Sequence, residues 1–338
     1  MLLSVVSLAL MTLVGRHDQD EQFWGAWKNI QPSVVRIYRA GERIGTGVMI
    51  DPSGYFIARQ PIRQGEPLTG ETSSGKFFPL TRVSEDSASG LVLLESPTAM
   101  VSGILAAQVV PHAIHKGDPV LIVLADSVES GQVTNPDRLG VMTAKNRLIP
   151  LAEYNLESAT PALAGAPVFN YRGELVGLLN ANLATGAYPR RVIRVAVRFV
   201  EREPRQQPGT YLVSPQVRNY GPASLTVAYS LGPDWLRRVI TGFLSPSHEV
   251  QHPWIGVFVR DSLSGGAYVD AVEPESPAFD AGLRRGDVIF KLGEYAIPNQ
   301  MAYARVLLLQ EVGRQVKIGF FRDGEPITTM LTVSRARG

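Results

Sequence analysis

Residues 276–290 read SPAFDAGLRRGDVIF, a run with helix signals at its start and strand signals at its end. Ser276 suits the N-cap of a short helix because its hydroxyl accepts a hydrogen bond from an early helical N–H, and Pro277 fits the first turn. Gly282 is the residue type that ends helices in a left-handed conformation. The next apolar run, Asp287 to Phe290, is typical of a strand.

Similar signals continue around this run. Tyr268 to Val272 predicts a strand before it, and Met301 to Gln310 predicts a second helix after it. Two further strands, 316–321 and 327–333, flank Asp323-Gly324, a dipeptide that favours a tight hairpin turn. The sequence therefore predicts a small α+β module at the end of the chain.

The part of the chain that precedes this module has a different sequence pattern, in which short apolar runs alternate with turn residues. The 32 Gly and 24 Pro favour turns, and strands at such short spacing are typical of a β sandwich or barrel. Strand-like runs lie at 33–38, 45–50, 55–57, 91–94, 119–124, 166–169 and 174–179. Helical patterns occur at 23–30 and 233–240. The expected fold class is mainly β.

Composition sets broad limits. With 338 residues the chain has room for two domains, and its net charge of +2 calls for no nucleic-acid partner. The absence of Cys excludes disulfides, thiolate zinc sites and a cysteine nucleophile. The apolar run Met1–Val14 is shorter than the roughly 20 residues of a bilayer span and matches a signal-peptide core, or a segment that docks on protein. We expect residues 1–22 to be a signal peptide or membrane anchor with a polar linker, and hence an extracytoplasmic (periplasmic) or membrane-associated protein.

Several strings resemble the HtrA/Deg serine proteases, in the same order along the chain. Residues 45–57 (GTGVMIDPSGYFI) and 173–178 (GELVGL) resemble strands of the protease domain. Residues 253–257 (PWIGV) resemble the start of a PDZ domain, and 276–289 is close to the PDZ string SPAxxAGLxxGDVI. The resemblance implies a trypsin-like double Greek-key β-barrel at 23–246, with an Arg-rich insertion at about 185–224, and a PDZ domain at 247–338.

The positions of the catalytic triad differ from this family's pattern. The family's His stands in a TNNHV string, where this chain has 58–62 (ARQPI) and therefore Pro61. The Asp of TDLAVLK is replaced by Gly90, and the Ser of NPGNSGGPL by Ala164. Acyl transfer needs a hydroxyl, a base and an orienting acid, which these three side chains lack. We expect no serine-protease activity; a non-standard catalytic site is the alternative.

A second catalytic motif is present at 248–252, where His248-Glu249-Val250-Gln251-His252 matches the HExxH string of zinc proteases. Such a site needs a continuous helix and a third ligand, for which only a carboxylate such as Asp261 or Asp270 could serve. Pro246 and Pro253 confine any helix here to about one turn. We interpret the match as accidental and expect no metal or cofactor.

A PDZ domain binds an extended peptide, usually a hydrophobic C-terminal tail, beside an edge strand. By resemblance, the carboxylate-binding loop is Trp254-Ile255-Gly256-Val257. The facing helix would contribute Met301, Arg305 and Leu308, with a purely structural role as the alternative for each side chain.

The functional hypothesis is therefore a pseudoprotease that acts as a scaffold, adaptor or structural subunit. Its partners would be proteins, bound by the PDZ domain, the barrel surface or the Arg-rich insertion, within a membrane-associated complex or a homo-oligomer. The HtrA relatives commonly form trimers. The alternatives are an active protease, serine- or zinc-dependent, and a chaperone-like holdase.

Overall fold

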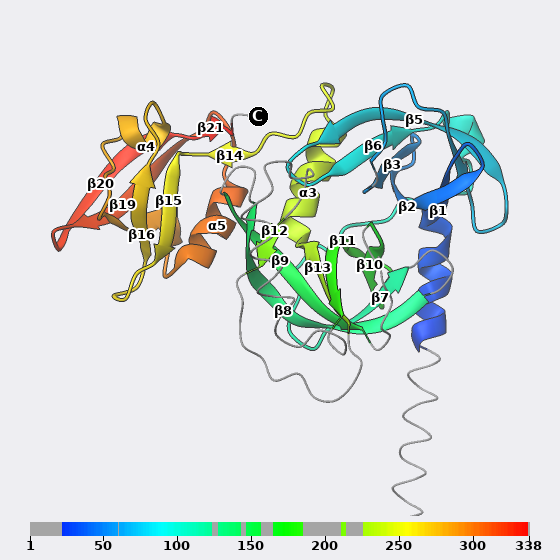
Figure 1. Ribbon diagram of the computed structural model, residues 1–338, viewed down its shortest axis with the longest axis horizontal. Helices are drawn as coiled ribbons and strands as arrows, with labels where there is room; N and C mark the ends of the chain where they lie inside the picture. Colours follow the sequence, from blue (N-terminus) through cyan, green and yellow to red (C-terminus); the bar gives the residue numbers. More distant parts are fainter. Residues whose placement is uncertain are drawn as a thin grey trace, which may run out of the picture. The chain divides into compact units, whose positions relative to one another are not determined.

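The computed structural model describes residues 22–59, 61–123, 128–142, 147–156, 165–184, 211–213 and 226–336. It contains two barrel-like sheets and a smaller α+β module, so the mainly β architecture expected from the sequence is confirmed (Figure 1). The N-terminal apolar run, Ala164 and most of the Arg-rich insertion lie outside the described residues. Among the described residues, none of the helices has the length and hydropathy that a bilayer crossing requires.

The first sheet closes on itself in the order β1-β2-β3-β6-β5-β4. It follows a helix at 22–30 and contains η1 (Gln31–Ser33), β1 (Val34–Arg39), β2 (Glu42–Asp51), β3 (Tyr55–Ala58), β4 (Leu68–Glu71), β5 (Phe77–Asp86), β6 (Leu91–Glu95) and η2 (Thr98–Met100). Alternate residues fill its interior: Val35 and Ile37 of β1 join the core, where the rings of Phe56 and Phe78 stack 5.6 Å apart. Pairing of β1 with β4 closes the barrel.

The second sheet has the order β12-β8-β7-β10-β11-β13-β9, and β8 also pairs with β9. Its strands are β7 (Pro119–Val123), β8 (Val128–Met142), β9 (Arg147–Leu156), β10 (Pro167–Asn170), β11 (Leu175–Ala184), β12 (Tyr211–Val213) and β13 (Thr226–Leu231). β12 is the part of the Arg-rich insertion that the structure describes. In the core, the buried hydroxyls of Tyr154 and Ser230 lie 2.8 Å apart, and burial raises the pKa of Tyr154 well above its ordinary value.

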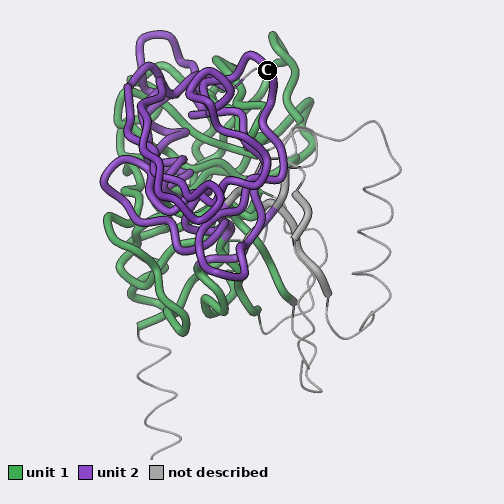
Figure 2. Tube along the Cα trace, turned by 90° about the vertical axis from the view of Figure 1, so that its left-hand side faces the viewer, with its two compact units in different colours: residues 1–136, 152–189, 219–233 green, residues 137–151, 190–218, 234–338 purple. Residues whose placement is uncertain are grey.

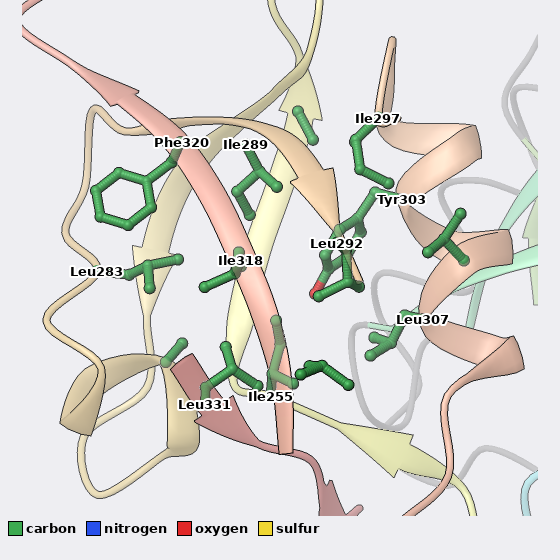
Figure 3. Packing of buried hydrophobic residues seen from close by; sticks show 14 of the residues in the cluster. Ile255, Leu283, Ile289, Leu292, Ile297, Tyr303, Leu307, Ile318, Phe320 and Leu331 are labelled. Carbon is green, nitrogen blue, oxygen red and sulfur yellow. The ribbon is translucent and has the colours of Figure 1, made fainter. Parts of the chain in front are cut away.

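The C-terminal module matches the expected element order. It contains β14 (Pro253–Trp254), β15 (Val257–Asp261), β16 (Ala267–Val272), α4 (Pro277–Asp280), β17 (Val288–Leu292), β18 (Tyr295–Ala296), α5 (Gln300–Leu309), β19 (Gln315–Arg322), β20 (Glu325–Thr332) and β21 (Ser334–Arg335). The main sheet runs β15-β16-β17-β19-β20. Tyr303 and Leu307 of α5 face Leu292 of β17 in its apolar core (Figure 3).

The helix and turn signals in this module are confirmed. The Ser276 hydroxyl accepts a hydrogen bond from the Phe279 N–H at 3.2 Å, and Gly282 ends the turn with φ +79°. In the β19–β20 hairpin, Asp323 and Gly324 both have positive φ, as a type I′ turn requires.

By contacts, the chain divides into two compact units (Figure 2). Residues 1–136, 152–189 and 219–233 form the first unit, and 137–151, 190–218 and 234–338 form the second. Helix α3 (Pro233–Phe243) thus groups with the C-terminal module, although the sequence-based boundary at 246 places it in the preceding domain.

Arg238 of α3 connects this helix to the C-terminal end of α5. Its guanidinium donates to the carbonyls of Leu308 (2.9 and 2.5 Å), Gln310 (2.6 Å) and Gln251 (3.0 Å). The first two carbonyls belong to the end of α5, where a cation also opposes the negative end of the helix dipole. Burial lowers the pKa of Arg238, and the charge of Glu311 opposes this effect.

We expect Arg238→Met to destabilise the second unit by about 2 kcal/mol, because charged hydrogen bonds to these carbonyls are lost. The measurement is urea unfolding, together with hydrogen exchange at the end of α5. Arg237→Met is the matched control: Arg237 pairs with Asp234, and losing this partly exposed pair should cost less than about 1 kcal/mol. Equal effects of the two variants would contradict the assigned role of Arg238.

Candidate functional site

Two of the three positions predicted for the degenerate triad lie at one end of the first barrel. Strands β3 and β6 are antiparallel neighbours, with Ala58 opposite Val92. Pro61 follows the end of β3 and Gly90 precedes the start of β6, so the register brings both to the same end of this strand pair. A His at position 61 and an Asp at position 90 would therefore be neighbours. This is the arrangement that the resemblance to the TNNHV and TDLAVLK strings implies.

The segment around Pro61 is held by two arginines. Arg39 donates to the Pro61 carbonyl at 2.7 Å, and Arg82 donates to the Ile62 carbonyl at 2.5 Å. Arg39 also pairs with Glu66 at 2.7 Å, while the Ile62 side chain is buried in the barrel core. The backbone at Pro61 and Ile62 is thus fixed in place by side chains of the barrel.

Gly90 ends a tight turn that begins at Asp86. Its N–H donates to the Asp86 carbonyl at 2.8 Å, and its φ is +70°. The buried Asp86 carboxylate accepts the N–H groups of Ala88 and Ser89 at 3.3 and 3.1 Å. Glycine adopts this left-handed backbone without steric cost.

Ala164, the third position, lies outside the described residues, and the prediction for it stays a prediction. The next described residue is Gly165, whose N–H donates to the Leu179 carbonyl of β11 at 2.7 Å.

The HExxH string does not form a helix. Helix α3 ends at Phe243, and the His248 imidazole lies 2.6 Å from the Phe243 carbonyl. Glu249 pairs with Arg335 at 2.8 Å, and the His252 ring packs against Trp235 at 5.0 Å. The two His therefore do not lie on one face of a helix, which is the geometry that a zinc protease uses.

The two carboxylates considered as a third ligand are also engaged. Asp261 accepts the Gln300 N–H at 2.8 Å, and Asp270 pairs with Arg260 at 3.0 Å. Over the described residues no group of three or more metal-ligating side chains comes together.

The predicted carboxylate-binding loop has the backbone geometry of an anion site. The Ile255 carbonyl accepts the Ala278 N–H at 2.9 Å, and the Gly256 carbonyl accepts the Glu273 N–H at 2.8 Å. Because the peptide bonds are trans, the N–H groups of Gly256 and Val257 point away from these carbonyls. Consecutive N–H groups directed to one side of a loop can hold a carboxylate.

Gly256 is required by this loop for two reasons. Its φ is +82°, and a Cβ added here would lie 2.1 Å from the Ser276 Cβ. Ser276 is fully buried and caps α4, so it cannot move aside without loosening that helix.

An edge strand lies next to the loop. β15 is the terminal strand of its sheet and contacts α5. The Asp261 side chain at the end of β15 binds the first N–H of α5, where Asn299 is the N-cap, and so fixes the helix beside the strand. An extended peptide can add to such an edge with its C-terminus at the Gly256 loop.

The other predicted groove residues differ in exposure. Trp254, Val257 and Met301 are partly exposed, whereas Ile255 lies in the module's core and Leu308 is 3% exposed. Ile255 thus contributes its backbone to the loop. Arg305 pairs with Asp137 at 3.0 Å, a contact that links α5 to β8.

Comparison with known proteins supports this architecture. The PDZ domain family matches residues 253–333. "Serine protease Do-like HtrA" of Lactococcus lactis subsp. cremoris is 23% identical over 86% of this chain and 71% of its own length. "Periplasmic serine endoprotease DegP" of Salmonella typhimurium is 24% identical over 87% of this chain, which spans only 57% of that relative.

A solved structure described as "HtrA-type protease AlgW with tripeptide" superimposes with a TM-score of 0.65 at 16% identity, covering 94% of this chain and 98% of that one. The trypsin-like double barrel and the PDZ domain are thereby confirmed as the fold. In domain order, fold and sequence, the chain is similar to the HtrA/DegP family of trypsin-like serine proteases with a C-terminal PDZ domain.

Proposed function

We propose that this chain is a non-catalytic HtrA-type protein that binds protein partners by their hydrophobic C-terminal tails, as a scaffold, adaptor or structural subunit. The observation that carries the proposal is the identity of the triad positions, Pro61, Gly90 and Ala164. None of these side chains can attack a carbonyl, take a proton or orient a base. The relatives are named proteases, so the proposed loss of activity distinguishes this chain from them.

The backbone supports the same proposal. Loss of one triad member can be reversed by a single substitution when the backbone is unchanged. Here the left-handed turn at Gly90 favours glycine, and Arg39 binds the backbone carbonyl of Pro61.

The binding half of the proposal is carried by the Gly256 loop and the β15 edge. The proposal includes a location outside the cytoplasm, either periplasmic or membrane-associated. The DegP relative is named periplasmic, and residues 1–14 have the length of a signal-peptide core.

Catalysis is tested by treating the purified chain with a fluorophosphonate probe beside an active DegP, and by casein digestion with and without a metal chelator. We expect labelling and cleavage only in the DegP sample. Stoichiometric labelling of this chain, or chelator-sensitive cleavage by it, would refute the non-catalytic assignment.

Binding is tested with a fluorescein-labelled decapeptide ending in Ala-Leu-Val. We expect binding of the free acid and at least about tenfold weaker binding of its C-terminal amide, because the loop holds a carboxylate. Equal affinity of the two peptides would show that the loop does not bind the C-terminal carboxylate.

A further inference from the structure

Arg238 precedes the PDZ domain in the sequence, yet it binds both sides of one end of the predicted peptide groove. The PDZ family match begins at residue 253, ten residues after the end of α3. The guanidinium donates to the Leu308 and Gln310 carbonyls at the end of α5 and to the Gln251 carbonyl. Gln251 lies just before β14, which leads into the predicted carboxylate-binding loop. Helix α3 and the PDZ domain belong to the same compact unit.

The end of α5 depends on this contact, because the last carbonyls of an α-helix have no donor within the helix. Gln310 serves two of them: its side-chain amide donates to the Val306 carbonyl at 2.8 Å, and its N–H to the Leu307 carbonyl at 3.0 Å. The Leu308 carbonyl accepts from Arg238. The last turn of α5 contains no basic residue, so Arg238 also supplies the cation that a helix C-terminus favours.

The other end of α5 is held from within the PDZ domain. The Asn299 side chain accepts the Ala302 N–H at 2.8 Å, and Asp261 accepts the Gln300 N–H at 2.8 Å. Asp261 ends β15, the strand beside which a peptide is expected to add. The helix that flanks the groove is thus fixed at one end by the groove's own strand and at the other end by a residue of α3.

We propose that Arg238 is a positioning residue for the peptide groove, so that the peptide-binding unit of this chain includes α3 as well as the PDZ domain. This inference rests on the proposed function and identifies what holds α5 beside the loop. Without the guanidinium, the end of α5 is released. The loop itself keeps its shape, because the Ile255 and Gly256 carbonyls are bound by the N–H groups of Ala278 and Glu273.

The last side chain of the bound tail is the one that should sense this change. Successive side chains of an extended peptide point to opposite faces. With its carboxylate at the loop, the last residue is expected beside Val257, which packs against the same apolar core as Tyr303 and Leu307 of α5. The residue before it then points away from the helix. The contribution of the last side chain to affinity therefore reports the position of α5.

The test compares fluorescein-labelled decapeptides that end in Ala-Leu-Val, Ala-Leu-Ala and Ala-Ala-Val, each bound to the full chain. In the unchanged chain, replacing the last Val by Ala should weaken binding about tenfold, because two methyl groups leave an apolar groove. Arg238→Met should weaken binding of the Ala-Leu-Val peptide about tenfold and reduce the effect of the last side chain to about threefold. The effects of the Leu-to-Ala change and of C-terminal amidation should each stay within about twofold of their values in the unchanged chain.

Two further variants separate positioning from folding. Arg238→Lys keeps the cation, but one ammonium group cannot reproduce the planar fork that reaches three carbonyls, so its affinity should fall only about threefold. Arg237→Met removes the neighbouring cation of α3, which pairs with Asp234, and should keep the affinity within about twofold. Urea unfolding of each variant sets the temperature at which it stays folded during the binding assay. If Arg238→Met does not fold, Arg238→Lys provides the comparison.

Equal losses for all three peptides in the Arg238 variants would assign this residue to stability alone and overturn the inference. Unchanged affinities in these variants would overturn it as well. If the unchanged chain binds none of the peptides, the proposed function fails and this inference fails with it. If the unchanged chain binds the free acid and the Arg238 variants bind in the same way, only this inference fails.

Discussion

Replacing Gly256 by alanine is expected to weaken binding of the free-acid peptide by at least about a hundredfold, equivalent to roughly 3 kcal/mol. Left-handed backbone costs an L-residue about 1–2 kcal/mol. The new Cβ would also lie 2.1 Å from the Ser276 Cβ, so the loop must move. Because the N–H groups of this loop are the expected partners of the peptide carboxylate, their displacement removes the main anchor. Fluorescence anisotropy with the labelled decapeptide measures the effect.

Gly282 provides the matched control for this prediction. It lies in the same domain and has φ +79°, but a Cβ added there meets nothing within 4 Å. Gly282→Ala should therefore lower the free energy of unfolding by about 1 kcal/mol, from the left-handed backbone alone. Its affinity for the peptide should stay within about threefold of that of the unchanged chain. If both variants lose binding alike, general loosening of the domain is the cause and the Gly256 loop is not the carboxylate site.

The sequence predicted the PDZ domain well because its signals are local. Ser276, Pro277 and Gly282 act within one short turn, and Asp323-Gly324 defines its hairpin by itself. Each of these residues does in the structure what its chemistry favours in isolation.

Contacts between distant segments could not be read in the same way. Arg238 binds carbonyls about seventy positions away, and Arg305 meets Asp137 across a gap of 168 positions. The strands β4 and β8 were also not predicted: Leu68–Glu71 is short, and β8 contains Pro136 and many polar residues. Such strands are specified by their neighbours more than by local propensity.

The partners of Arg36 could likewise not be predicted from the sequence. Arg36 sits in an alternating strand, where an outward arginine usually signals only a solvated face. Its position between Thr46 and Glu71 depends on the register of three strands. Pro61 and Gly90 were named from the sequence, and the β3–β6 register places them at the same end of this strand pair. Their assignment to a degenerate catalytic triad stays a prediction.

Asp287 and Arg322 supply the second large expected effect. Asp287 is 1% exposed, and Arg322 binds its two oxygens with Nε at 2.8 Å and Nη2 at 2.9 Å. The carboxylate also accepts the Arg284 N–H at 2.8 Å, and Arg322 donates to the Gly282 carbonyl at 2.7 Å. The hydrogen bond to Asp287 is the main reason why the pKa of Arg322 is raised above its ordinary value. The pair joins β19 to the turn before β17.

Arg322→Leu is expected to destabilise the PDZ domain by about 3–5 kcal/mol, because it leaves a buried carboxylate without its counter-ion. Asp287→Asn should cost less, since the remaining guanidinium is a quarter exposed and can reach water. Combining the two substitutions should recover part of the loss, because the stranded charge is then gone. Urea unfolding, with hydrogen exchange resolved at 288–292 and 315–322, measures the change without the screening that guanidinium chloride would add.

The exposed pair Arg260–Asp270 in the same domain makes this prediction specific. Its nitrogen–oxygen distance of 3.0 Å is close to that of the buried pair, but its side chains are 54% and 43% exposed. Asp270→Asn should therefore cost less than about 1 kcal/mol. Similar losses for Arg322→Leu and Asp270→Asn would mean that the Asp287 carboxylate is solvated in solution. The large difference that we expect follows from burial and from the number of hydrogen bonds, because the Asp287 carboxylate is shielded from water and binds two guanidinium nitrogens, whereas one hydrogen bond joins Arg260 to the exposed Asp270.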